Sequence, residues 1–145
     1  MDTITFRSKE LNYLAPSGWS ESLSVGHPVL DGQHKRLLRI CQHLGNTIDD
    51  DSPDGVEQFH IVLNDLAEYA NEHFSTEERI LREHSYPDLA AQVEEHFEYR
   101  SRLAQFLMEA TKGYLNRQEL QLFLGAWWKE HIIASDKLYS PYLQK

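Results

Sequence analysis

Four stretches of this chain repeat apolar residues at the three- and four-residue spacing of an α-helix. The spacing predicts helices over residues 31–49, 56–83, 87–112 and 117–139. Helices with one apolar stripe must bury it against one another, and short connections make neighbouring helices antiparallel. We therefore expect an all-α fold, an up-down-up-down four-helix bundle with an irregular N-terminal arm.

The ends of the predicted helices are marked by residues that interrupt helices. Asp31 is the expected N-cap of the first helix, and Pro87 is expected to open the third. Gly113 fits the C-cap of the third helix, and Pro141 is expected to follow the end of the fourth. Residues 1–30 hold several prolines and glycines without a sustained period, so they are assigned to the arm, with Trp19 and Leu23 as anchors. Residues 31–145 are then one bundle domain.

Composition excludes several classes of partner. The chain has 145 residues and a formal net charge of −9. Nucleic acids and anionic membranes attract basic surfaces, so neither is an expected partner. No apolar run is long enough to span a membrane, and the first residues do not resemble a signal peptide. A single cysteine cannot form an internal disulfide, and a cytoplasmic location is expected.

Histidines and carboxylates lie on the predicted apolar stripes. His73 and Glu77 are four residues apart and share a helix face, as do Gln92 and His96. Positions five apart lie about 140° apart on an α-helix. His131 and Asp136 have that spacing, so both reach one centre only if the centre is approached from two sides, and a pair of metal ions about 3.5–4 Å apart has that width. The predicted ligands are His34, His73, Glu77, Gln92, His96, His131 and Asp136.

Each of these residues taken alone is more often a surface residue or a satisfied core residue than a ligand. Together they predict metal binding, because unpaired charges inside a bundle cost several kcal/mol. No Lys or Arg is predicted to point inward near them. Imidazole with carboxylate suits Fe, Zn and Mn, and the absence of thiolates argues against a structural zinc site.

The pattern resembles the hemerythrin family, in particular its bacterial branch, the bacteriohemerythrins. The resemblance runs from Trp19 to about Leu138. It rests on WSESLSVGHPVLDGQH at 19–34, HFSTEE at 73–78, YP at 86–87 with His96 beyond it, and WWKEHIIASD at 127–136. It implies a four-helix bundle with an oxo- or hydroxo-bridged centre of two Fe ions that binds O2 reversibly, as carrier or store.

The resemblance also implies a role for each predicted ligand. Glu77 and Asp136 would bridge the two irons. One iron, the one that binds O2, would be held by His34 and His73. The other would be held by His96 and His131.

Gln92 departs from the family pattern, which usually has histidine at this position. Three readings stay open: direct ligation through the amide oxygen, ligation by a water that Gln92 holds, or a position left without a ligand. Replacement from nearby is not expected, because Glu94 and Glu95 fall on the outer face and His84 lies too far along its helix. Tyr99 is expected inside the core.

Several hydrophobic residues flank the predicted ligands. The resemblance implies that they line the O2 pocket, and a core role is compatible with that. Trp128 stands where relatives commonly have a smaller aliphatic residue. Cys41 is expected in the core. The predicted pocket residues are Phe74, Trp127, Trp128 and Ile132. Four other histidines are expected in solvent: His27, His43, His60 and His84.

Two functions other than O2 carriage stay open. A weak seventh ligand leaves an open iron position, which would suit a diiron enzyme with peroxidase or oxidase activity. A sensor of O2, NO or iron would need an unidentified protein partner, since no second domain is evident in the sequence.

Overall fold

The computed structural model describes residues 19–113 and 115–144, and the part of the predicted arm before Trp19 lies outside them. The described residues form only helices and connecting segments. In chain order these are the 3-10 turn η1 (Glu21–Leu23), α2 (Pro28–Gly45), α3 (Pro53–Glu83), α4 (Leu89–Thr111), α5 (Arg117–Glu130), the π-helical turn η2 (His131–Asp136) and α6 (Lys137–Leu143).

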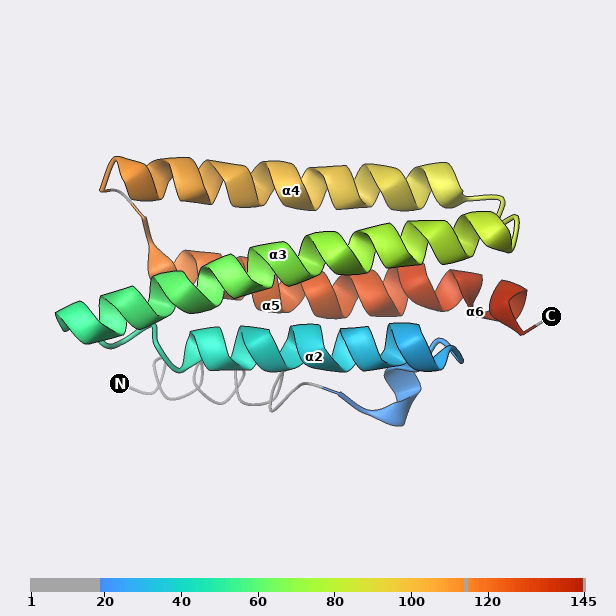
Figure 1. Cartoon of the computed structure of the whole chain (residues 1–145), viewed down its shortest axis with the longest axis horizontal. Helices are drawn as coiled ribbons and strands as arrows, with labels where there is room; N and C mark the ends of the chain where they lie inside the picture. The colour runs from blue at the N-terminus through green and yellow to red at the C-terminus, as the bar shows by residue number, and fades with distance from the viewer. Residues whose placement is uncertain (1–18, 114, 145) are drawn as a thin grey trace.

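The helices run lengthwise beside one another and reverse direction at each connection (Figure 1). The continuous run of α5, η2 and α6 is the fourth helix of the bundle, and α2 packs against both α3 and α5. The predicted all-α fold and four-helix bundle are therefore confirmed. None of the helices within the described residues is long and apolar enough to cross a membrane.

Two apolar clusters fill the bundle, one along its length and one at the end where α6 lies. The larger contains Leu37, Phe74 and Ile132, and the smaller contains Leu30, Ile80 and Tyr139. On α2, α3 and the fourth helix, a predicted ligand lies between the residues that belong to one cluster and those that belong to the other. The predicted ligands therefore lie between two water-excluding layers.

The start of α2 differs from the prediction. Asp31 is not the N-cap: the helix begins at Pro28, after His27. The Asp31 carboxylate instead accepts hydrogen bonds from the Val25 N–H (2.8 Å) and the Ser24 hydroxyl (2.6 Å), so it ties the preceding segment to the helix. The predicted anchors are confirmed for the described part, since Leu23 is in the core and Trp19 packs against it.

Two further boundary predictions were wrong. The third helix begins at Leu89 rather than Pro87, because residues 87 and 88 form a turn. Pro141 lies inside α6 rather than after it. Proline removes one backbone hydrogen bond, but Tyr139, Tyr142 and Leu143 pack into the smaller cluster, so tertiary contacts keep the last turn helical.

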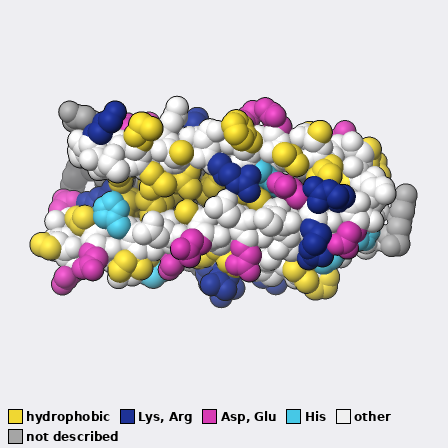
Figure 2. Space-filling model, turned by 45° about the horizontal axis from the view of Figure 1, so that its top comes forward, with side chains coloured by type: hydrophobic (Ala, Val, Ile, Leu, Met, Phe, Trp, Pro, Cys, Tyr) yellow, Lys and Arg dark blue, Asp and Glu magenta, His cyan; other side chains and the backbone are white. Residues whose placement is uncertain are grey.

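Charged side chains are mixed on the surface. Figure 2 shows one face of the molecule, where acidic and basic side chains are interspersed and none of the basic ones forms an extended patch. Val93 is 39% exposed, because the buried stripe of α4 is centred on Gln92, His96 and Tyr99. His43 and His60 are exposed as predicted, whereas the side chains of His27 and His84 are half-buried.

Candidate metal centre

All seven predicted ligands are buried, with exposed fractions between 0 and 3%. Their histidine and carboxylate atoms form two groups, each with ligand atoms within 4.8 Å of one another, and Glu77 belongs to both. The first group contains His34, His73, Glu77 and Asp136, and the second contains Glu77, His96 and His131.

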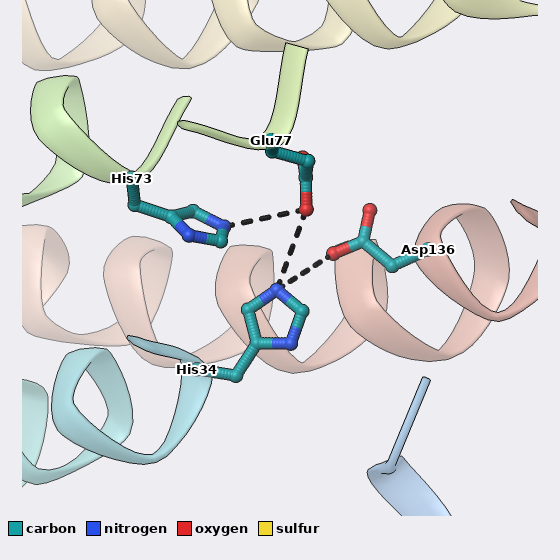
Figure 3. A group of neighbouring side chains, drawn as sticks. All are labelled: His34, His73, Glu77 and Asp136. Carbon is teal, nitrogen blue, oxygen red and sulfur yellow. Dashed lines mark ion pairs between the residues drawn. The ribbon is translucent and has the colours of Figure 1, made fainter. Parts of the chain in front are cut away.

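The first group is built from α2, α3 and the π-helical turn (Figure 3). The Nε2 atom of His34 lies 3.1 Å from Asp136 Oδ2 and 3.4 Å from Glu77 Oε2. The Nε2 atom of His73 lies 3.4 Å from the same oxygen of Glu77. Two imidazole nitrogens and two carboxylate oxygens thus converge on one point.

The second group uses the other oxygen of each carboxylate. The Nε2 atom of His96 lies 2.9 Å from Glu77 Oε1. The Nε2 atom of His131 lies 3.0 Å from Asp136 Oδ1 and 3.7 Å from Glu77 Oε1. Each carboxylate therefore turns one oxygen toward each half of the centre.

The local geometry of the fourth helix explains how residues five apart meet. Residues 131–136 form a π-helical turn, in which hydrogen bonds join residues five apart, and the Lys137 N–H bonds to the Ile132 carbonyl. Asp136 therefore lies over His131 on one face. The expectation that the pair approaches the centre from two sides assumed a regular α-helix, and it was wrong for that reason.

Three of the four histidines are oriented by partners on their outer nitrogen. The Nδ1 atoms of His73, His96 and His131 lie 2.7 Å from Gln33 Oε1, 2.6 Å from Glu78 Oε2 and 3.3 Å from Glu95 Oε1. An ionised carboxylate only accepts hydrogen bonds, so the Nδ1 of a histidine bonded to one carries the hydrogen and donates it. With Nδ1–H held in this way, Nε2 is the nitrogen directed at the centre, and its lone pair would be available to a bound metal.

Sequence reasoning missed these partners. Glu95 was predicted on the outer face, but the structure places it half-buried on the side of α4 that faces η2. There its carboxylate also accepts a hydrogen bond from the Ser135 hydroxyl at 2.7 Å. Helix periodicity places Glu95 away from His96, and only the packing of α4 against the fourth helix brings it to His131. Glu94, by contrast, is exposed as predicted.

Tyr139 is a further residue that the sequence reasoning did not assign to the site. Its side chain is fully buried, and its hydroxyl donates a hydrogen bond to Glu77 Oε2 at 2.8 Å. Its position three residues after Asp136, on the same stripe, was the only sequence signal. The hydrogen bond holds Glu77 in place from the side of the smaller cluster.

Gln92 lies one turn before His96 on α4 and is 2% exposed. Its Oε1 atom is buried and has no hydrogen-bond partner in the described part of the chain. A buried amide oxygen left unpaired is costly, so this oxygen suits a ligand or a bound water. His84 bonds to the Ile80 carbonyl through Nδ1 and belongs to neither group.

Aromatic rings enclose the histidines. Phe74 stacks on His96, with ring centroids 3.9 Å apart, and Trp127 stacks on His131 at 4.5 Å. Trp128 is fully buried, lies edge-on to His73 and donates from Nε1 to the Tyr99 hydroxyl at 3.2 Å. Ile132 is also fully buried, while Trp127 is half-buried.

The electrostatics of the protein alone show how strongly these groups interact. Burial by itself lowers the pKa of His34, but the carboxylates of Asp136 and Glu77 outweigh it and raise that pKa to about 9. Burial raises the pKa of Glu77, yet the neighbouring histidines, His73 first, hold it well below its usual value. The buried carboxylates are therefore stable in their ionised form only with positive charge beside them.

The donor set fits metal ions better than it fits protons. No Lys or Arg is among the buried side chains of residues 19–113 and 115–144. Three inward Nε2 atoms and both Asp136 oxygens lie close to opposite groups without hydrogen-bond geometry. A cation between them would satisfy all of these atoms at once. The atoms in question are the Nε2 atoms of His34, His73 and His131 and the two carboxylate oxygens of Asp136.

Comparison with known proteins agrees with this geometry. Residues 25–143 match the hemerythrin HHE cation-binding domain. The chain belongs to the hemerythrin family. The resemblance to this family is therefore confirmed, and the matched range spans the positions of the seven predicted ligands.

Curated relatives and solved structures point to the same family. The chain is 28% identical over 126 residues to a bacteriohemerythrin of Stenotrophomonas maltophilia, covering 87% of this chain and 80% of that one. It is 26% identical over 124 residues to a bacteriohemerythrin of Clostridium acetobutylicum, covering 83% and 96%. The solved structure of a wild-type hemerythrin superposes with a TM-score of 0.80 at 26% identity, covering 88% of this chain and 97% of that one.

Proposed function

We propose that this hemerythrin-family protein is a non-haem diiron protein that binds O2 reversibly, as a carrier or store. The observation that carries the proposal is the position of Glu77 and Asp136. Each places one oxygen beside His34 or His73 and the other beside His96 or His131. Two carboxylates shared between two histidine pairs are the arrangement that helix bundles use for two metal ions.

The residues divide between the two ions in this proposal. His34 and His73 would hold the iron that takes O2, His96 and His131 would hold the other, and Glu77 and Asp136 would be shared by both. When bound, two ferrous ions would supply the electrons for reversible O2 binding. Gln92 completes the second half through its amide oxygen or through a water, which its unpaired buried Oε1 supports.

The protein orients the ligands and excludes water. The hydrogen bonds to Nδ1 hold three imidazole rings with Nε2 inward, and the Tyr139 hydroxyl holds a proton at Glu77 Oε2. Phe74, Trp128 and Ile132 are fully buried, and in this proposal they would line the O2 pocket. A dry pocket limits the loss of bound oxygen by reaction with water. We place the protein in the cytoplasm, with O2 as its ligand.

Iron analysis combined with optical spectroscopy tests the proposal. After anaerobic loading with ferrous iron, we expect two irons per chain and an optical spectrum that changes on adding O2 and reverts on removing it. One iron or fewer at saturating iron would overturn the diiron assignment. Turnover of peroxide with a reductant, without reversible O2 binding, would instead support the peroxidase or oxidase alternative.

A further inference from the structure

The two histidine pairs differ in the groups that hydrogen-bond to their Nδ1 atoms. In the first pair, His73 Nδ1 bonds to the neutral Gln33 amide, and His34 Nδ1 is buried with no hydrogen-bond partner among residues 19–113 and 115–144. In the second pair, His96 Nδ1 bonds to the Glu78 carboxylate and His131 Nδ1 to the Glu95 carboxylate. Among the described residues, one half of the centre is therefore backed by two carboxylates and the other by none.

A carboxylate that accepts the Nδ1–H of an imidazole changes how tightly that imidazole binds a metal. An anionic acceptor on Nδ1–H makes Nε2 more basic, and loss of such a partner typically costs 10–100-fold in metal affinity. It also favours the more highly charged state of the metal, because it adds negative charge nearby. The half of the centre that has this backing is also the half in which Gln92 replaces an imidazole by a weaker neutral donor.

We propose that Glu78 and Glu95 are positioning residues that compensate for Gln92, so that the second half retains its ion despite one weak ligand. This inference rests on the proposed function, because it assumes one ion in each half. It assigns the two carboxylates a role in making the halves unequal: the second ion is held by fewer imidazoles but by more basic ones.

The two carboxylates should not contribute equally. Glu78 Oε2 lies 2.6 Å from His96 and its side chain is 20% exposed. Glu95 Oε1 lies 3.3 Å from His131, its side chain is 37% exposed, and the same oxygen accepts from Ser135. Water screens the more exposed and more distant carboxylate, so Glu78 should have the larger effect.

Three matched variants of the full chain test the proposal. Glu78→Gln and Glu95→Gln remove the charge but keep an oxygen that can accept the Nδ1–H, and Glu94→Gln removes an exposed charge from the same region. With the iron-loaded protein and an excess of chelator, Glu78→Gln should speed the loss of one iron about 10-fold. Glu95→Gln should have a smaller effect on the same iron, and Glu94→Gln none. Zn²⁺ titration of metal-free protein should show the same order in the weaker binding step.

A potential measurement separates electronic tuning from simple structural support. Glu78→Gln should raise the reduction potential of one iron and leave that of the other unchanged. Gln33→Glu adds a carboxylate behind His73, so it should lower the potential of the other iron and slow its release. This converse variant keeps the test open even if Glu78→Gln fails to fold.

Several outcomes overturn the inference. It fails if the loss rate of both irons changes equally in Glu78→Gln, if neither changes, or if Gln33→Glu leaves the potentials unchanged. A parent protein that holds fewer than two irons would contradict the proposed function itself, and the two failures are therefore distinguishable.

Discussion

Glu77 shows what a single residue decides in this centre. It is fully buried, its two oxygens face different histidines, and the Tyr139 hydroxyl bonds to one of them. No other carboxylate takes part in both ligand groups found within the described residues. Substitutions of the ligands around it should therefore affect each half separately, which makes the role of Gln92 measurable.

Substitution of Gln92 tests how the second half is completed. Gln92→His supplies an imidazole, a stronger donor than an amide oxygen, so it should slow iron loss to a chelator and slow oxidation of the oxygenated form. Gln92→Ala should speed iron loss if the amide ligates directly, and should change it little if a water does. Identical iron loss and identical spectra in all three proteins would show that position 92 holds no ligand.

Trp128 is the second residue whose role can be measured. Trp128→Leu should leave the iron content intact but change the rates of O2 entry or of oxidation to the ferric state, measured by stopped flow, because it opens space beside His73. It should also lower the free energy of unfolding by about 2 kcal/mol, since a large buried side chain is lost.

Trp128→Phe is the matched control for this change. It keeps an aromatic ring against Phe74 but removes the hydrogen bond from Nε1 to the Tyr99 hydroxyl. We expect kinetics closer to the parent than those of the Leu variant. If neither variant alters the kinetics, Trp128 is only a core residue.

At the scale of single elements, the π-helical turn is the feature with the largest consequence. It brings Asp136 over His131, and it is followed by α6, which delivers Tyr139 to Glu77. An uninterrupted α-helix from Arg117 would turn Asp136 away from His131 by about 140°. The local departure from α-helical geometry therefore builds both halves of the centre.

Helix caps offer a prediction at the same scale. The Ser52 hydroxyl accepts a hydrogen bond from the Gly55 N–H at the start of α3, the helix that carries His73 and Glu77. Ser52→Ala should lower the free energy of unfolding by about 1 kcal/mol, measured with denaturant. Ser101→Ala, at an exposed position inside α4, should cost nothing or stabilise slightly. Equal effects of both changes would contradict the capping role.

At the scale of the whole molecule, buried charge is enclosed between two apolar clusters, so metal binding and folding are linked. Metal that binds the folded chain at 1,000 times its dissociation constant stabilises it by about 4 kcal/mol. We expect the iron-loaded protein to melt at a clearly higher temperature than the metal-free protein. Equal melting temperatures would show that the buried ligands are satisfied without metal.

The pH dependence of the metal-free protein follows from its histidines. The pKa of His34 is raised from 6.5 to about 9, and that of His131 is also raised, because their carboxylate neighbours outweigh burial. A raised pKa stabilises the folded state below 6.5 and ceases to do so as pH rises through the folded pKa. The lowered pKa of His73 changes the stability in the opposite direction, but it is a single group, whereas two histidines have raised pKa values.

The metal-free protein should therefore lose stability as the pH rises from 6.5 through the raised pKa of His34, about 9. The loaded protein, whose ligands hold metal rather than protons, should not. Thermal melts of both forms across this range test the prediction, which is contradicted if the difference in melting temperature does not widen with pH.

The residues that carry the chemistry could be read from the sequence because helix periodicity is a local property. His73 with Glu77 and Gln92 with His96 are separated by one helical turn, so their shared burial followed once the helices were recognised. The predicted bundle and the family resemblance followed from the same stripes and motifs.

Only the tertiary structure decided the contacts that depend on packing between helices or on irregular backbone. The π-helical turn, the reach of Glu95 to His131, the hydrogen bond from Tyr139 to Glu77 and the continuation of α6 through Pro141 all belong to this class. A sequence pattern shows which face a residue occupies on an ideal helix. It does not show how far neighbouring helices rotate or where one extra residue widens a turn, because those are set by the sum of contacts across the bundle.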